Sequence, residues 1–118
     1  MKLSEILSLF EEYAPGSYQE KYDNSGLATG NRDAEIKSVL LCLDATPEII
    51  TEAVSLGANL VISHHPVIFN PLRNLTGDDP VTQTVVSAVR NNIALFSAHT
   101  NMDNIYIGVN KKICDKLG

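Results

Sequence analysis

The sequence predicts a single α/β domain, folded as a three-layer sandwich with a mostly parallel sheet and alternating strands and helices. Three short apolar runs, at residues 38–43, 60–63 and 93–97, are typical of buried strands. Segments whose apolar residues recur at helical spacing lie between and after these runs. Strands joined by single helices become parallel neighbours through right-handed crossovers. With 118 residues and 44% hydrophobic content, the chain can bury a core of its own.

The N-terminal segment is expected to be a helix followed by a turn. Its apolar residues share one helical face and Pro15-Gly16 ends the pattern. The face consists of Leu3, Ile6, Leu7 and Phe10. Residues 22–27, Tyr-Asp-Asn-Ser-Gly-Leu, have the composition of a turn rather than of a binding loop.

Three further helices complete the predicted alternation. The first begins at Thr46, whose hydroxyl is a suitable N-cap before Pro47, and ends at Gly57. The second begins at Asp79-Pro80 and ends at Asn91-Asn92, after an inner face of valine and alanine. The last covers residues 109–118, with apolar residues at helical spacing.

Composition excludes several classes of protein. The formal net charge is −5 and the nine Lys and Arg residues are scattered, which argues against generic nucleic-acid binding but not against a phosphorylated small molecule. Cys42 and Cys114 lack a C-x-x-C spacing, so we expect free, buried thiols in a reducing compartment. No signal segment opens the chain and no apolar run approaches a membrane span. We therefore expect a cytoplasmic protein without membrane contact.

All three histidines follow strand-like segments. His64 and His65 are adjacent, in a Ser-His-His-Pro motif directly after the second predicted strand. His99 follows the third predicted strand, and the carboxylate of Asp103 comes four residues later. Neutral imidazole is the commonest side-chain ligand for borderline transition metals, and carboxylates complete such sites. The residue types therefore favour a divalent metal such as zinc, manganese, iron or nickel.

The predicted sheet topology places these residues close together in space, although they are far apart in the sequence. In open parallel sheets, ligands bind beyond the carboxyl ends of the strands. Five side chains are expected at that edge: Asp44, His64, His65, His99 and Asp103. Adjacent residues in extended backbone point to opposite faces, so the two neighbouring histidines share one ion only if the chain turns sharply. Otherwise they serve two ions, or one of them supports the other ligands.

Several alternatives remain open at this stage. His99 is either a ligand or a group that only hydrogen-bonds Asp103. Asp44 either caps the following helix or belongs to the site, where Asp44 and His99 are the local candidates for a general base. A purely structural role for every one of these residues is a weaker hypothesis than a functional site, because they all lie at the same edge of the predicted sheet. Neither a phosphate-binding glycine motif nor a G-x-S-x-G elbow is present, so Ser63 beside His64 does not indicate a serine hydrolase.

Four segments in this order resemble a known family. They are residues 22–27, residues 43–46 (Leu-Asp-Ala-Thr), residues 58–69 (which contain Ser-His-His-Pro and Ile-Phe) and residues 98–103 (Ala-His-Thr-Asn-Met-Asp). The sequence is similar to the NGG-interacting-factor-three-like family, whose bacterial members are labelled GTP cyclohydrolase type 2 homologs. The resemblance implies a dinuclear site with His64, His65 and Asp103 as ligands and His99 close by. It also implies ring-like homo-oligomers.

The sequence departs from the family pattern in two ways. Tyr22 stands where the family often has Trp, and family members are about twice as long, with a further His and Glu ligand near their C-terminus. We therefore expect residues 1–118 to be the N-terminal portion of a longer family-type chain, inactive as it stands, with two ions per full-length subunit. The resemblance implies a metal-dependent hydrolase of nucleotide-like or phosphorylated small molecules. The alternative is a non-catalytic metal-binding regulatory or protein-interaction module.

Overall fold

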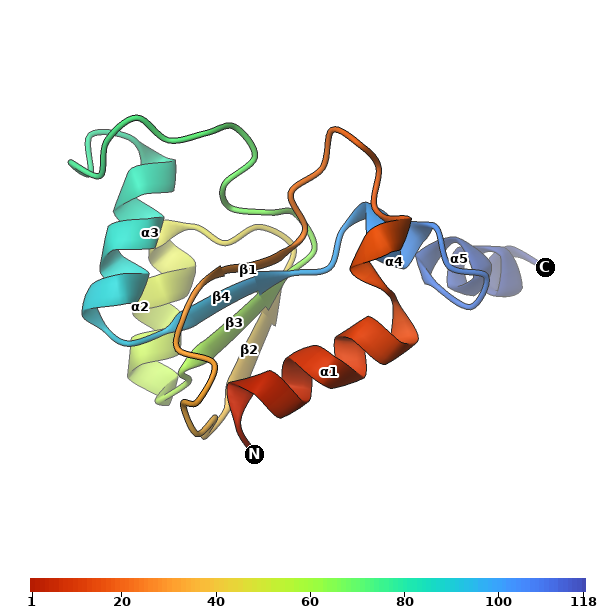
Figure 1. The fold of residues 1–118 in the computed structure, drawn as a ribbon, viewed down its shortest axis with the longest axis horizontal. Coiled ribbons are helices and arrows are strands. Elements are labelled where there is room, and N and C mark those ends of the chain that lie inside the picture. Colours follow the sequence, from red (N-terminus) through yellow and green to blue (C-terminus); the bar gives the residue numbers. More distant parts are fainter.

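The computed structural model describes all residues from 1 to 118 and contains five α-helices and four strands (Figure 1). The helices are α1 (Leu3–Tyr13), α2 (Pro47–Leu56), α3 (Pro80–Arg90), α4 (Thr100–Asp103) and α5 (Val109–Leu117), with a 3-10 turn, η1, at Gly16–Tyr18. The strands are β1 (Gly26–Thr29), β2 (Val39–Cys42), β3 (Leu60–Ser63) and β4 (Ala94–Ser97). The three predicted strands and four predicted helices are confirmed, whereas β1 and α4 were not predicted.

The sheet is mixed, so the prediction of a mostly parallel sheet is wrong. Its strand order is β1-β4-β3-β2, in which β2, β3 and β4 run parallel and β1 pairs antiparallel with β4. β1 begins at Gly26, inside the segment whose composition indicated only a turn. Gly30 ends the strand at a φ of 141°, and a Cβ at this position would lie 2.6 Å from the Cβ of Ala94. The backbone of β1 therefore turns away at a point of close approach to β4.

Helices cover both faces of the sheet unequally. Helices α2 and α3 lie on one face, over a core cluster of Ile50, Ala53, Ala58, Val61, Ala88, Ile93 and Leu95. On the other face α1 packs through Leu3 on Leu60, Ala94, Phe96 and Ala98. Leu40 and Cys42 of β2 face the first cluster, so Leu41 points to the second face, where it is 71% exposed. Because α1 leaves this part of the sheet open, a complete three-layer sandwich is not confirmed.

The predicted helix boundaries follow from local hydrogen bonds. The hydroxyl of Thr46 accepts a hydrogen bond from the backbone N–H of Ile49 at 3.3 Å, and Gly57 ends α2 in the left-handed conformation. The carboxylate of Asp79 accepts a bond from the backbone N–H of Thr82 at 3.0 Å at the start of α3. This bond and that of the Thr82 hydroxyl lower the pKa of Asp79 below its ordinary value.

Helix α5 extends away from the sheet beyond α4 (Figure 1). Its apolar residues are largely uncovered, with Ile113 50% and Leu117 83% exposed. Both cysteines are free as predicted, but Cys114 on this helix is exposed rather than buried. Cys42 is partly buried; burial, with the charges of Asp44 and Glu52, raises the pKa of its thiol. None of the helices combines the length and the apolar character that crossing a membrane requires.

Candidate metal centre

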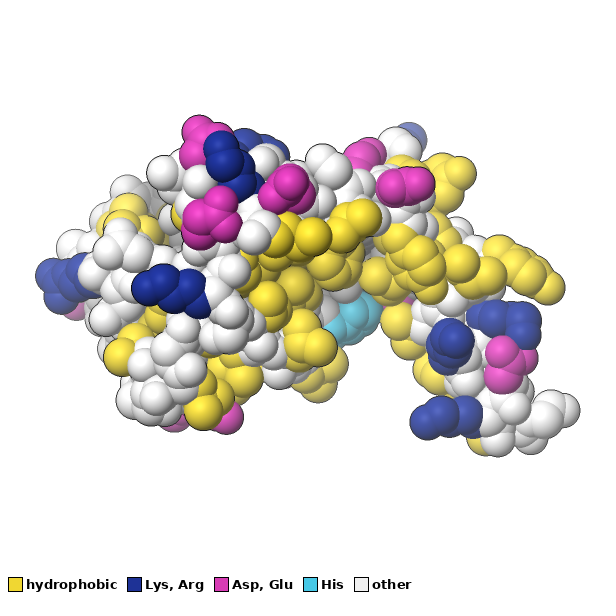
Figure 2. Space-filling model, turned by 90° about the horizontal axis from the view of Figure 1, so that it is seen from below, with side chains coloured by type: hydrophobic (Ala, Val, Ile, Leu, Met, Phe, Trp, Pro, Cys, Tyr) yellow, Lys and Arg dark blue, Asp and Glu magenta, His cyan; other side chains and the backbone are white.

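The three histidines form a compact triangle at the carboxyl ends of β3 and β4. The ring centroids of His64 and His65 are 5.1 Å apart, those of His64 and His99 are 5.1 Å apart, and those of His65 and His99 are 5.3 Å apart. One nitrogen from each ring lies within 4.8 Å of the other two. Figure 2 shows histidine side chains in a recess between the sheet and the C-terminal helical segment. The predicted convergence of the histidines at this edge is therefore present.

A bend in the chain brings the two adjacent histidines to the same side. β3 ends at Ser63, and the Ser63 hydroxyl donates a hydrogen bond to the carbonyl of His65 at 2.7 Å. The backbone N–H groups of His64 and His65 still donate to the carbonyls of Cys42 and Leu43, at 3.2 and 3.1 Å. Because the backbone is no longer extended here, the alternation that would separate the two rings does not apply.

Hydrogen bonds fix the orientation of both adjacent rings. The Nδ1 atom of His64 lies 2.9 Å from the carbonyl oxygen of Ala98. A carbonyl only accepts hydrogen bonds, so this Nδ1 carries the proton and the Nε2 lone pair is free. The Nδ1 atom of His65 lies 2.7 Å from Oδ1 of Asp44. Asp44 thus holds His65, while Thr46 supplies the side-chain cap of α2, so the alternative of Asp44 as the helix cap is not observed.

His99 is held in the same way by a residue that sequence reasoning missed. Its Nδ1 atom lies 3.0 Å from Oδ1 of Asp23, not against Asp103. The Asp23 side chain is fully buried and also accepts bonds from the Thr100 N–H at 3.1 Å, the Thr100 hydroxyl and the Ser25 hydroxyl. Burial raises the pKa of the Asp23 carboxyl, but the bonds from His99, Thr100 and Ser25 outweigh it and hold the pKa well below its usual range.

Asp103 lies at the rim of the triangle rather than inside it. Its Oδ1 is 4.0 Å from Nε2 of His64, which is too long for a hydrogen bond. The separation is roughly twice the usual zinc–ligand distance of about 2.0–2.2 Å. Both atoms could contact one ion only if it lay almost directly between them, at a wider angle than a tetrahedral zinc site provides. Asp103 reaches this position because α4, an unpredicted single turn, follows directly after His99.

Comparison with known proteins identifies the family. A family model described as Duf34/NIF3 (NGG1p interacting factor 3) matches residues 1–118. The chain belongs to this family. A GTP cyclohydrolase 1 type 2 homolog of Clostridium perfringens is 40% identical over 118 residues, which is 100% of this chain and 45% of the relative. A homolog of the same name from Bacillus subtilis is 34% identical over 113 residues, which is 96% of this chain and 30% of the relative.

Solved structures agree with this assignment. A Bacillus cereus protein related to NIF3 is 39% identical with a TM-score of 0.92, over 100% of this chain and 32% of that one. Reduced HcgD from Methanocaldococcus jannaschii is 34% identical with a TM-score of 0.89, over 98% of this chain and 46% of that one. The predicted family is confirmed, and this chain spans less than half the length of these relatives.

The donor set of this NIF3-family chain fits a transition metal. Three imidazole nitrogens within 4.8 Å of one another are a donor set that zinc, iron, nickel and manganese accept, and a nearby carboxylate adds negative charge. Each ring is oriented through its Nδ1 by a backbone carbonyl or a carboxylate, which is how proteins fix metal-binding histidines.

Proposed function

We propose that this chain contributes a centre for divalent transition-metal ions, and that the complete family-type protein uses two such ions to hydrolyse a nucleotide-like or phosphorylated small molecule. His64, His65 and Asp103 are the proposed ligands, as the family resemblance implies. His99 joins them, because its ring centroid lies 5.1 and 5.3 Å from those of His64 and His65, which are themselves 5.1 Å apart. The convergence of three oriented imidazoles is the observation that carries this proposal.

An ion bound at this site would supply Lewis-acid stabilisation of developing negative charge and activation of water for attack. The protein groups supply the remaining requirements. Asp44 and Asp23 hold two rings in the tautomer that leaves Nε2 free. Asp44 is also the best local group to accept a proton. Its side chain is 59% exposed, and the hydrogen bond with His65 uses only Oδ1, which leaves Oδ2 to act as the base.

A non-catalytic role in regulation or protein interaction is the second candidate function. The exposed apolar residues of β2 and α5, such as Leu41 and Leu117, favour it, because patches of this kind mark surfaces that pack against another protein. The same patches support the homo-oligomer that the family resemblance implies. The two free cysteines support the cytoplasm as the compartment.

Metal titration tests the shared part of both functions. Zinc, manganese, iron(II) and nickel would each be titrated into metal-stripped protein in competition with a chromophoric chelator. We expect His64→Ala, His65→Ala and His99→Ala each to weaken binding by roughly ten- to a hundred-fold. Asp115→Asn, which removes an exposed carboxylate from α5, is the matched control and should bind as the parent does. Equal affinity in the parent and all three histidine variants would rule out the centre.

Turnover separates the two functions. Hydrolysis of GTP would be measured with the metal-loaded 118-residue chain and with a longer family-type protein under the same conditions. The hydrolase proposal expects turnover by the longer protein that Asp44→Asn reduces. Metal binding without any turnover by the longer protein would favour the regulatory alternative.

A further inference from the structure

Two exposed aromatic rings lie together on the loops that support the histidines. The ring centroids of Tyr22 and Phe69 are 6.4 Å apart and their planes are inclined at 56°. Tyr22 is 66% exposed and Phe69 is 47% exposed, so both present ring surface to solvent instead of to the core. Neither ring is needed to orient the histidines, and the contact between them leaves most of their apolar area unburied.

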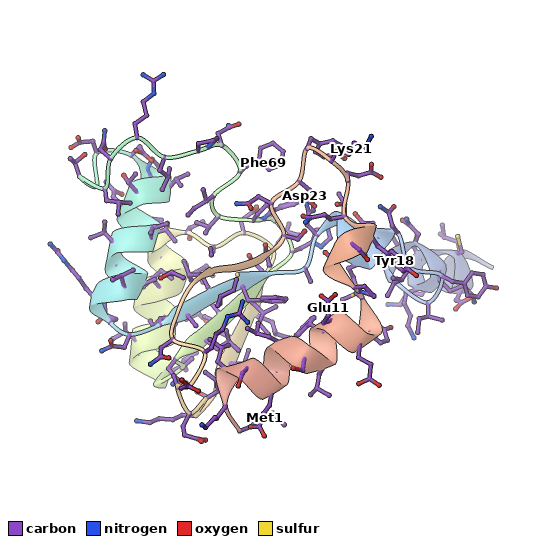
Figure 3. The ribbon with its side chains drawn as sticks, in the orientation of Figure 1. Met1, Glu11, Tyr18, Lys21, Asp23 and Phe69 are labelled. Carbon is purple, nitrogen blue, oxygen red and sulfur yellow. The ribbon has the colours of Figure 1, made fainter.

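Both rings are close in the chain to groups that hold the site. Tyr22 directly precedes Asp23, whose carboxylate orients His99. Phe69 follows the histidine pair in the loop after β3, and the side-chain amide of Asn24 ties the two loops together by donating to the carbonyl of Ile68 at 2.8 Å. Figure 3 shows Asp23 and Phe69 on these neighbouring loops. The aromatic pair therefore lies on the two loops that carry Asp23 and follow the histidine pair.

The loop that carries Tyr22 is anchored on both sides of the ring. The backbone N–H of Glu20 donates to the hydroxyl of Thr100 at 2.8 Å, and the N–H of Asp23 donates to the carbonyl of Glu20 at 3.0 Å. The N–H of Ser25 donates to the side chain of Gln19 at 3.0 Å. A ring on an anchored loop loses little backbone freedom when a ligand stacks on it, which favours binding.

We propose that Tyr22 and Phe69 bind the planar heteroaromatic ring of a nucleotide-like ligand whose phosphate end reaches the histidine centre. This inference rests on the proposed function, because the metal centre anchors the other end of the ligand. The two rings already contact each other in a tilted arrangement at 6.4 Å and 56°, so a ligand ring would stack on their outward faces instead of between them. Because Tyr22 is 66% and Phe69 47% exposed, both side chains leave ring surface uncovered for such stacking.

The test compares two probes that share a sugar phosphate and differ in the ring. Guanosine 5′-monophosphate and ribose 5-phosphate would be titrated into the 118-residue chain, both metal-free and zinc-loaded, with calorimetry and saturation-transfer NMR as readouts. The variants are Tyr22→Ala and Phe69→Ala, with Tyr22→Phe as the conservative change that keeps the ring. Tyr106→Ala is the matched control, because it removes an 84% exposed tyrosine from the segment before α5. Zinc affinity and the melting temperature would be measured for every variant.

We expect the nucleotide to bind roughly ten- to a hundred-fold more tightly than ribose 5-phosphate. Tyr22→Ala and Phe69→Ala should remove most of that difference without changing ribose phosphate binding, zinc affinity or the melting temperature. Tyr22→Phe and Tyr106→Ala should bind as the parent does. Equal binding of the two probes by the parent, or equal nucleotide binding by the parent and both alanine variants, would overturn the ring site. Absence of zinc binding would instead overturn the metal centre, and the metal-free titrations would still decide the ring contact.

Discussion

The two carboxylate–histidine pairs of the site have the same chemistry in opposite surroundings. Asp44 and His65 are 2.7 Å apart with side chains 59% and 46% exposed, whereas Asp23 and His99 are 3.0 Å apart with side chains 0% and 18% exposed. The exposed pair competes with water and salt, so it contributes little to stability. The buried pair belongs to a network in which the carboxylate accepts several hydrogen bonds. The Asp23–His99 pair is therefore part of the buried structure, whereas the Asp44–His65 pair lies at the surface.

The largest effect is expected for Asp23→Ala. This change leaves the donors of buried Thr100 and partly buried Ser25 without their acceptor, and it frees the ring of His99. We expect a loss of about 2–4 kcal/mol in the free energy of unfolding and a ten- to a hundred-fold loss of metal affinity. Urea unfolding and chelator competition would measure the two quantities. A loss of stability below about 0.5 kcal/mol would contradict the contrast drawn between the pairs.

Asp103→Asn should separate metal binding from stability. Asp103 is partly exposed and its nearest site atom, His64 Nε2, is 4.0 Å away, so its charge does not support the folded state through a hydrogen bond. We expect metal affinity to fall by roughly ten- to a hundred-fold while urea unfolding stays unchanged. If metal affinity is the same in this variant and in the parent, Asp103 is not a ligand.

Asp44→Ala should have a smaller effect than Asp23→Ala on both measurements. The exposed pair is expected to contribute at most about 1 kcal/mol to stability. Metal affinity should fall by about ten-fold, because His65 loses the partner that fixes its tautomer. The same unfolding and competition assays check this result. A destabilisation as large as that of Asp23→Ala would show that exposure does not distinguish the two pairs.

The sequence predicted the parts of the fold that depend on local pattern. The parallel strands β2, β3 and β4 are continuous apolar runs, and the helices between them carry caps at Thr46 and Asp79. Because these strands are parallel, their carboxyl ends meet, and the convergence of the histidines followed from topology alone.

The missed features depend on contacts between distant segments. β1 is four residues long and forms by pairing with β4, about 70 positions later in the chain. The single turn of α4 is fixed by Asn101, whose side chain accepts from the His99 N–H and donates to the carbonyl of Ala14. Asp23 sits in a polar turn sequence, and nothing local reveals that its carboxylate becomes buried against Thr100. Only the family resemblance singled out that segment.

Acid unfolding gives the finest test of the contrast between the pairs. Hydrogen bonds hold the pKa of Asp23 below its ordinary value in the folded state, so its ionised form stabilises the fold. This contribution is complete above the unfolded pKa of about 3.9 and is lost as the pH falls toward the folded pKa. We therefore expect the unfolding free energy of Asp23→Asn to depend less on pH below about pH 4 than that of the parent. Asp44→Asn serves as the matched variant, because it removes the carboxylate of the exposed pair in place of the buried one. Urea unfolding across this pH range measures both slopes, and equal slopes in the parent and Asp23→Asn would show that the buried network does not depend on the charge of Asp23.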